Sequence, residues 1–190
     1  MTAVLFLPKR FEDGRGWFSE TWHEQRCASL GINANFCQDN HSLSLHAGTI
    51  RGLHFQREPY AQAKLVRCLR GRILDVAVDI RRASPTFGHW VGVELSATNG
   101  KQLFIPAGYA HGFHTLEDNS EVAYKVDVYY APEADGGIAW HDPDIGIEWQ
   151  LADMKPLLSD KDNVLPLLDE AELDFQYDGK PLLPLEEPQF

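Results

Sequence analysis

Short apolar runs separated by turn residues fill the sequence over Gly48–Tyr130. No long stretch with helical periodicity lies between these runs, and strands at this spacing are typical of all-β sandwiches and barrels. The run Ile73–Ile80 alternates, with its even-numbered residues aliphatic and Asp75 and Asp79 on the opposite face, which predicts a half-buried strand. Helices are expected only near Ser19–Leu30 and within the last forty residues.

The chain is long enough for one sizeable core but short for two. With 190 residues and 44% apolar side chains, a chain of this size buries roughly 70% of the surface that its unfolded state exposes. We therefore expect a single domain over residues 1–190, with its core in about residues 10–165. The acidic, proline-containing segment 166–190 is expected to be irregular or short-helical cover.

The charge balance excludes nucleic acid as an expected partner. Asp and Glu total 28 against 17 Lys and Arg, and a formal charge of −11 is the wrong sign for neutralising a phosphate backbone. Locally the balance reverses, because the segment Arg51–Arg82 holds eight basic and three acidic residues. An anion could bind there.

Cysteine content and hydropathy bear on the compartment. Cys27, Cys37 and Cys68 form no C-x-x-C pair and are odd in number, which favours a reducing cytoplasm over a disulfide framework. The apolar stretch Ala3–Leu7 is too short for a signal-peptide core or a membrane span. We therefore expect no membrane association.

Two histidine motifs stand out. The segment Gly100–His111 has the spacing G-x5-P-x-G-x2-H, and Gly48–His54 has the spacing G-x5-H. Together they resemble the two cupin motifs, which implies a double-stranded β-helix, or jelly roll, with a few short peripheral helices and with both histidines pointing into the barrel. Pro106 and Gly108 form a turn that should fix the register of the strand carrying His111.

The same motifs lack the usual metal ligands. Metal-binding cupins resemble one another in an H-x-H pair, a nearby Glu and the later His, but residue 56 is Gln and Glu58 comes too early. Two imidazoles without a carboxylate make a poor divalent site, so no metal is expected. Arg51 and Lys64, close to His54 in the sequence, instead favour a functional site over core packing.

Five of the other histidines are interpreted as surface or structural residues. His114 follows His111 by three residues and should lie on the opposite face of a regular strand. The others lie in turn-like or polar contexts: His23, His46, His89 and His141.

Ten segments carry a wider similarity: Glu12–Glu20, Gln38–Ser42, Arg51–Gln56, Ala61–Arg67, Asp75–Gly88, Ala110–Phe113, Tyr124–Lys125, Tyr129–Glu133, Gly137–Pro143 and Leu158–Asp162. In sequence and in order they resemble the dTDP-4-dehydrorhamnose 3,5-epimerase family over about residues 10–165. The resemblance implies a nucleotide-sugar epimerase of deoxysugar (dTDP-L-rhamnose) biosynthesis that needs no cofactor.

The resemblance also assigns catalytic roles. His54 would be the general base, and Asp162 the carboxylate that orients and polarises it. Lys64 would be the cation near the C4 oxygen of the substrate, with His111 a second pocket histidine beside it. Tyr124 would be the acid on the opposite face of the sugar.

Substrate contacts follow from the same resemblance. Arg51, Gln38 and Asn40 correspond to sugar and diphosphate contacts. The positions that hold the nucleotide and sugar are Arg15, Phe18, Glu20 and Tyr130, of which the first three reach in from a partner subunit. A homodimer with swapped N-terminal segments is therefore expected, and a closed two-fold dimer would also cover open sheet edges.

The expected chemistry requires these residue types. Inversion at C3 and C5 of a 4-keto sugar removes a proton α to the ketone and returns one from the other face, which needs a base, an opposed acid and an enolate stabiliser. A close alternative is an epimerase that acts at C3 only. A metal-dependent cupin enzyme and a non-catalytic sugar-binding cupin are more distant alternatives. No G-x-G-x-x-G or G-x-x-x-x-G-K motif is present to hold a nicotinamide or a phosphate loop.

Overall fold

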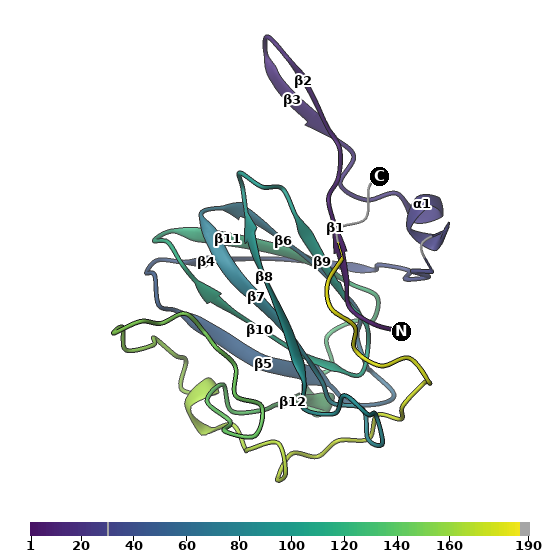
Figure 1. Ribbon diagram of the computed structural model, residues 1–190, viewed down its shortest axis with the longest axis vertical. Coiled ribbons are helices and arrows are strands. Elements are labelled where there is room, and N and C mark those ends of the chain that lie inside the picture. The colour runs from purple at the N-terminus through teal and green to yellow at the C-terminus, as the bar shows by residue number, and fades with distance from the viewer. Residues whose placement is uncertain (30, 187–190) are drawn as a thin grey trace.

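Two five-stranded antiparallel sheets pack face to face in the computed structural model, which describes residues 1–29 and 31–186 (Figure 1). Sheet I has the order β1 (Val4–Phe6), β9 (Gln102–Ile105), β6 (Lys64–Arg70), β11 (Ser120–Val126) and β4 (Gln38–Ser44). Sheet II has the order β12 (Asp135–Gly137), β5 (Ile50–Gln56), β10 (Tyr109–Thr115), β7 (Arg72–Asp79) and β8 (Trp90–Ser96). The predicted all-β jelly roll is confirmed.

One hydrophobic cluster fills the space between the sheets. It includes Val66, Ile73, Leu103 and Phe113, which come from strands of both sheets. A second cluster covers the outer face of sheet II, where Leu74, Val76 and Val78 of β7 meet residues far along the chain. These include Leu168, Ala171, Leu173 and Phe175.

The prediction of a half-buried strand at Ile73–Ile80 was wrong. The alternation is present, but all of β7 after Arg72 is buried, and Asp75 and Asp79 have no exposed surface. The physical reason is that both faces are covered, one by sheet I and the other by the segment around Leu168–Phe175.

The helices are fewer and shorter than expected. Within the predicted range Ser19–Leu30 the helix α1 spans Glu24–Ser29, and Leu30 lies outside the described residues. Over residues 151–186 the described chain contains only the 3-10 turn η2 (Asp162–Val164), so the expectation of an α-helix there was wrong. Another 3-10 turn, η1, spans Pro132–Ala134. No helix in the described part of the chain has the length and apolarity needed to cross a membrane.

The C-terminal segment 176–185, called the tail below, lies against the edge where sheet I ends at β1 and sheet II ends at β8 (Figure 1). The N–H of Leu183 donates to Thr2 Oγ1, just before β1, and the N–H of Leu182 donates to Thr86 Oγ1, in the loop before β8. Leu182 itself is buried in the cluster between the sheets. The tail therefore joins the two sheets at this edge.

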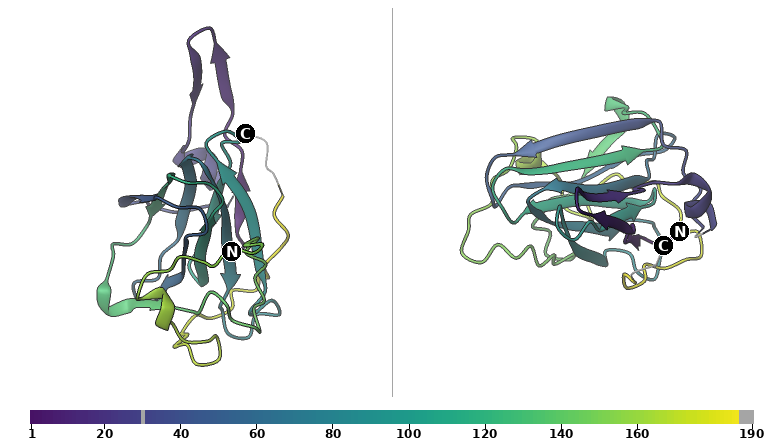
Figure 2. Two further views of the ribbon diagram at one scale, coloured as in Figure 1. Left: turned by 90° about the vertical axis from the view of Figure 1, so that its left-hand side faces the viewer. Right: turned by 90° about the horizontal axis from the view of Figure 1, so that it is seen from above.

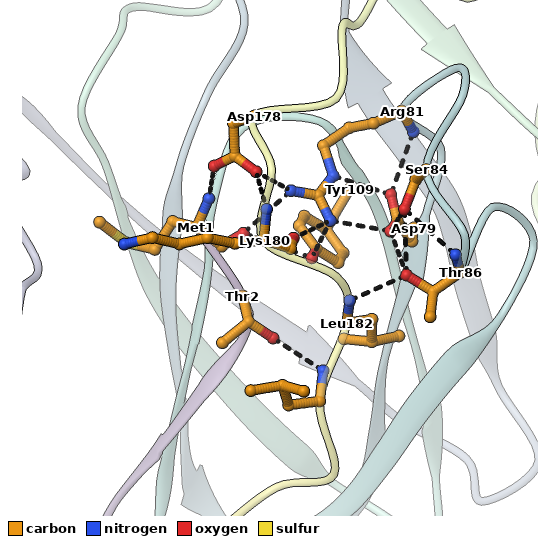
Figure 3. A network of polar contacts seen from close by, with 11 residues as sticks. Met1, Thr2, Asp79, Arg81, Ser84, Thr86, Tyr109, Asp178, Lys180 and Leu182 are labelled. Atoms are coloured by element: carbon orange, nitrogen blue, oxygen red, sulfur yellow. Dashed lines mark hydrogen bonds and ion pairs between the residues drawn. The ribbon is translucent and has the colours of Figure 1, made fainter.

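A buried arginine organises the same region (Figure 3). The Arg81 side chain is 3% exposed and donates to both carboxylate oxygens of Asp79, at 2.8 Å each. It also donates to the hydroxyl of Tyr109 at 2.7 Å, to Asp178 Oδ1 at 2.8 Å and to the Lys180 carbonyl at 3.0 Å. One guanidinium thus links β7, the start of β10 and the tail.

A two-stranded hairpin projects from the sandwich. It consists of β2 (Arg10–Asp13) and β3 (Gly16–Ser19), and it extends well beyond both sheets in Figure 1 and in the left-hand view of Figure 2. Three of its aromatic side chains are more than half exposed, namely Phe11, Trp17 and Phe18. The hairpin therefore presents an apolar surface that its own chain leaves uncovered.

Candidate active site

The pairing of β5 with β10 places the two motif histidines side by side. His54 and His111 are register partners in sheet II. Gly52 allows the close approach of these strands, because its φ of +126° suits glycine and a Cβ there would lie 2.6 Å from the Cα of Gly112. The predicted turn at Pro106–Gly108 is also present, and Gly108 has a φ of +87°. Both motifs therefore fix where the imidazoles lie.

A cleft opens between the sheets at the edge formed by β4 of sheet I and, in sheet II, by β5 with the short strand β12 beside it, opposite the tail. It has two adjoining cavities, of about 420 and about 300 Å³. Four residues line both cavities: His54, Lys64, Tyr124 and Lys161. These two cavities together are called the cleft below.

His54 forms a close pair with Asp162. Its Nε2 lies 2.6 Å from Asp162 Oδ1, with the carboxylate buried and the imidazole 31% exposed. The turn η2 positions the carboxylate, since the N–H of Asp162 donates to Ser159 Oγ. Burial disfavours the Asp162 anion, but the hydrogen bonds with His54 and Ser159 outweigh burial and hold the pKa of Asp162 below its ordinary value. The Asp162 anion can therefore orient the imidazole of His54.

His111 has a carboxylate partner of its own. Its Nε2 lies 2.7 Å from Asp75 Oδ1, and both side chains are buried in the floor of the cleft. Burial lowers the pKa of His111 even though Asp75 acts in the opposite direction. We therefore expect His111 to be neutral at physiological pH.

Lys64 is the buried cation of the cleft. Its Nζ donates to the carbonyl oxygen of His54 at 3.3 Å. Burial lowers its pKa to about 8, although the negative charges of Asp75 and Asp135 favour the ammonium form. Most Lys64 side chains are therefore still charged at neutral pH.

Tyr124 faces the histidines from the other sheet. It lies on β11 of sheet I, is half-buried, and lines both cavities of the cleft. Burial raises the pKa of its phenol, while the charge of Arg51 acts in the opposite direction. The hydroxyl therefore keeps its proton at neutral pH, as a proton donor requires.

Most of the predicted binding residues lie in the same cleft. Arg51 lines the larger cavity, and Gln38, Asn40 and Tyr130 line the smaller one. Gln38 Nε2 donates to Asn40 Oδ1 at 2.9 Å, and Gln38 Oε1 accepts the N–H of Tyr130. The Tyr130 ring is 56% exposed at the rim.

The structure does not bring the other three predicted contacts to this cleft. Arg15 and Phe18 lie on the projecting hairpin, and Glu20 follows it. Arg15 pairs with Asp13 of the same hairpin, Glu20 pairs with Arg26, and Phe18 is 70% exposed. In one chain these residues cannot contact a ligand that occupies the cleft.

Sequence reasoning missed three charged residues of the site. Asp75 was assigned to the solvent face of its strand, and Asp135 and Lys161, which form an ion pair at the cleft rim, were not singled out. An aspartate inside the apolar run Ile73–Ile80 was the available signal for Asp75. Adjacency to Asp162 was the signal for Lys161, whereas nothing in the sequence marks Asp135.

Gln56 stands where a metal-binding cupin would have its second histidine. Its side chain forms hydrogen bonds to the backbone of two neighbouring loops. Its Nε2 donates to the carbonyls of Tyr60 and Tyr129, and its Oε1 accepts the N–H of Ala131. Among residues 1–29 and 31–186, no group of three or more His, Cys, Asp or Glu side chains is placed to hold a metal ion. His114 is fully buried on the opposite face of β10, consistent with a structural role.

Comparison with known proteins shows the family of the chain. A family model described as dTDP-4-dehydrorhamnose 3,5-epimerase matches residues 2–170. The chain belongs to the dTDP-4-dehydrorhamnose 3,5-epimerase family. The match is longer at both ends than the segment of about 10–165 predicted from the sequence, and it ends before the tail.

Members of this epimerase family are similar over most of their length. The dTDP-4-dehydrorhamnose 3,5-epimerase of Salmonella typhimurium is 54% identical over 172 residues, which are 90% of this chain and 93% of that protein. A dTDP-6-deoxy-D-glucose-3,5-epimerase of Legionella pneumophila, solved in complex with dTDP-4-keto-L-rhamnose, is 44% identical with a TM-score of 0.86, over 91% of this chain and 92% of that one. A 3'-monoepimerase from Streptomyces bikiniensis, solved with dTDP-quinovose, is 36% identical with a TM-score of 0.82, over 88% and 84% of the two chains.

Proposed function

We propose that this protein is a dTDP-4-dehydro-6-deoxy-D-glucose 3,5-epimerase that acts in dTDP-L-rhamnose biosynthesis. The observation that carries the proposal is the cleft itself, in which His54 of sheet II, paired with Asp162, shares a cavity with Tyr124 and the buried Lys64 of sheet I. The names of the relatives supply the substrate class, a dTDP-linked 4-keto-6-deoxy sugar.

The first step removes a proton. The C4 ketone acidifies the C–H bonds at C3 and C5, and neutral His54 takes one of these protons through the imidazole nitrogen that does not face Asp162. The Asp162 carboxylate stabilises the imidazolium that forms and holds its ring in place. The electron pair of the broken C–H bond forms a double bond between that carbon and C4, and the C4 ketone becomes an enolate.

The enolate oxygen needs a positive environment. The Lys64 ammonium is buried, so its charge acts in a low-dielectric site, and the His111 ring lies beside it against Asp75. A fixed donor or cation at such a position commonly contributes several kcal/mol to lowering the barrier, about 3–4 where one donor has been removed.

The second step returns a proton from the opposite face. Tyr124 comes from sheet I whereas His54 comes from sheet II, so a sugar ring between them exposes one face to each. The phenol gives its proton to the carbanionic carbon, which inverts that centre. The tyrosinate regains a proton, and His54 loses one, before the next inversion.

Incubation with dTDP-4-keto-6-deoxyglucose in deuterium oxide tests this proposal. The product should be inverted at C3 and C5 and carry solvent deuterium at both carbons. Product with deuterium and inversion at C3 alone would support the alternative of a C3-only epimerase, which the similarity to a 3'-monoepimerase keeps in consideration. A protein that binds the sugar nucleotide without any exchange would be a non-catalytic sugar-binding cupin.

Independence from metal is part of the proposal. We expect full activity after treatment with a chelator, because the residues that face the substrate supply a base, an acid and a cation. Loss of turnover that one divalent ion restores would instead support a metal-dependent cupin enzyme.

We further propose a homodimer with swapped N-terminal segments, so that Arg15, Phe18 and Glu20 complete the cleft of the partner subunit. The support is the hairpin that projects from its own sandwich with Phe11, Trp17 and Phe18 exposed. Burying these aromatic rings against a second chain would be favourable by roughly 25 cal/mol per Å².

As its location we propose the cytoplasm, in keeping with cysteines that are all free.

A further inference from the structure

The two cavities of the cleft differ in chemical character. The smaller one adds five polar or charged residues to the shared ones, together with the aromatic rings of Phe55 and Tyr130: Gln38, Asn40, Gln56, Gln62 and Asp135. The larger one also has polar lining, including Arg51, His111 and Asp162, but it carries an apolar wall made of Phe113, Leu157 and Leu158. A ligand that spans the shared residues therefore meets mostly polar groups in the smaller cavity and can reach an apolar wall in the larger one.

The apolar wall begins directly beside the predicted position of the C4 oxygen. Phe113 follows His111 by two residues on the same face of β10, and the centroids of the two rings are 6.3 Å apart. Leu157 lies at the mouth of the larger cavity with 46% of its surface exposed. Its backbone is fixed against β5 and the turn before it, because its N–H donates to the Gly48 carbonyl and its carbonyl accepts the N–H of Ile50.

Arg51 lines only the larger cavity. Its guanidinium is hydrogen-bonded to β4 and is not directed at the apolar wall. Its Nε donates to Ser44 Oγ at 3.1 Å and its Nη2 to the Leu43 carbonyl at 3.2 Å, both on β4. Asp162, which also lines this cavity, is paired with His54. The apolar wall thus has no charged group directed at it from these two residues.

The substrate class has a matching asymmetry about C4. In a 4-keto-6-deoxy sugar the neighbour C3 carries a hydroxyl group, whereas the neighbour C5 carries a methyl group. If Lys64 holds the C4 oxygen, one of these substituents lies on each side of it. Water around a methyl group is released when it meets an apolar wall, whereas a hydroxyl group there would lose its hydrogen bonds.

We propose that Phe113, Leu157 and Leu158 form a subsite for the C5 methyl group, and that this subsite selects 6-deoxy sugars over their 6-hydroxy counterparts. This inference rests on the proposed function, because it takes the position of the ketone from it. It adds a basis for substrate choice that the catalytic residues do not supply. The hydroxyl at C3 lies in the polar half.

Two unreactive ligands test the subsite. dTDP-quinovose and dTDP-glucose both lack the C4 ketone and differ only in the 6-hydroxyl group. An apolar pocket discriminates against an added hydroxyl group by up to about 100-fold, and we expect a dissociation constant for dTDP-glucose at least about tenfold higher in titration calorimetry. Because Leu157 is half exposed, its replacement should not disturb folding.

The variant Leu157→Asn should reduce that ratio to about threefold or less, since its amide can hydrogen-bond to the 6-hydroxyl group. Leu183→Asn is the matched control, because Leu183 is 53% exposed on the tail, far from the cleft, and this variant should keep the wild-type ratio. Equal affinity of the wild type for both ligands, or an unchanged ratio in Leu157→Asn, overturns the subsite while the deuterium experiment still supports the epimerase. Failure to bind either ligand overturns the proposed function and the subsite with it.

Discussion

His54 and His111 have similar partners but different surroundings. Each imidazole meets a buried carboxylate at 2.6–2.7 Å, yet the His54 side chain is 31% exposed and that of His111 only 8%. A base must accept a proton from the substrate and pass it to solvent, which the partly exposed ring can do. The buried ring, whose pKa burial lowers, is neutral, and its single N–H donates to Asp75, so its other nitrogen can only accept a hydrogen bond in the cleft.

Deuterium exchange should separate the base from the acid. His54→Ala should abolish inversion and exchange together, because no proton leaves the ring without the base. Tyr124→Phe should lose inversion by about 10²–10⁴-fold but keep more of its exchange, since the proton can return to the face it left. Mass spectrometry and chirality of the product at C3 and C5 measure both. Wild-type inversion in Tyr124→Phe would mean that another group is the acid.

Lys64 should impose the alkaline limit of activity. Its pKa is lowered by burial to about 8, and only the charged form stabilises the enolate, so kcat/KM should fall as the pH rises through about 8. The folded state binds this proton less tightly than the unfolded state does, so Lys64 itself makes folding more favourable with rising pH over the same range. Unfolding on account of Lys64 therefore cannot explain the loss.

The variant Lys64→Gln checks this assignment. It should be slower by roughly 10²–10³-fold, the cost of removing one stabilising donor, and its pH profile should lack the decline near pH 8. A variant that keeps this decline would assign it to a different group.

At the scale of elements, buried charge joins segments that are distant in the sequence. Arg81 and Asp79 are 3% and 0% exposed, and breaking a buried ion pair by removing one partner costs about 3–5 kcal/mol. Arg81→Met should therefore lower the free energy of unfolding by about that amount in urea titrations. Arg72→Met is the control, because Arg72 pairs with Glu94 and Glu117 at the surface and should cost at most about 1 kcal/mol. Similar losses in both variants would contradict a structural role for the buried network.

The periodicity of the sequence predicted the strands well, but it did not predict which segments pack on their outer faces. The alternation in Ile73–Ile80 divided the strand correctly into two faces, because side chains alternate along any strand, but the face that carries Asp75 and Asp79 is buried and not exposed to solvent. It could not show that Leu168–Phe175, some ninety residues later, covers the outer face. For the same reason the segment 151–186 was expected to contain a helix, whereas its apolar residues are spaced to meet sheet II in an irregular path.

The residues that line the cleft were predictable where a motif or the family resemblance included them. His54 and His111 lie in glycine-bounded strand motifs, and family resemblance placed Lys64, Tyr124 and Asp162 in the same cleft from three other parts of the chain. Asp135 has no such context, since it follows η1 and meets Lys161 only through the fold. The direction of the hairpin away from its own cleft also depends on tertiary structure.

The two edges of the sandwich differ in what covers them. The tail closes the edge between β1 and β8, and the cleft opens at the edge between β4 and β5. β1 leads directly into the projecting hairpin, so the closed edge anchors the segment that we propose to enter a second subunit (Figure 1). In the proposed dimer, the closed edge of one chain would therefore serve the cleft of the other.

Mixing two defective variants tests this exchange. Tyr124→Phe has a defective cleft and an intact hairpin, whereas the double variant Arg15→Ala, Phe18→Ala has an intact cleft and a defective hairpin. In a swapped heterodimer one site combines both defects and the other combines both intact parts. After unfolding and refolding an equimolar mixture, half of the dimers should be heterodimers, so about a quarter of the wild-type sites, and of the epimerase activity, should return. If each hairpin served its own cleft, every site in the mixture would keep one defect, and the activity of the mixture would equal the mean of the two separate variants.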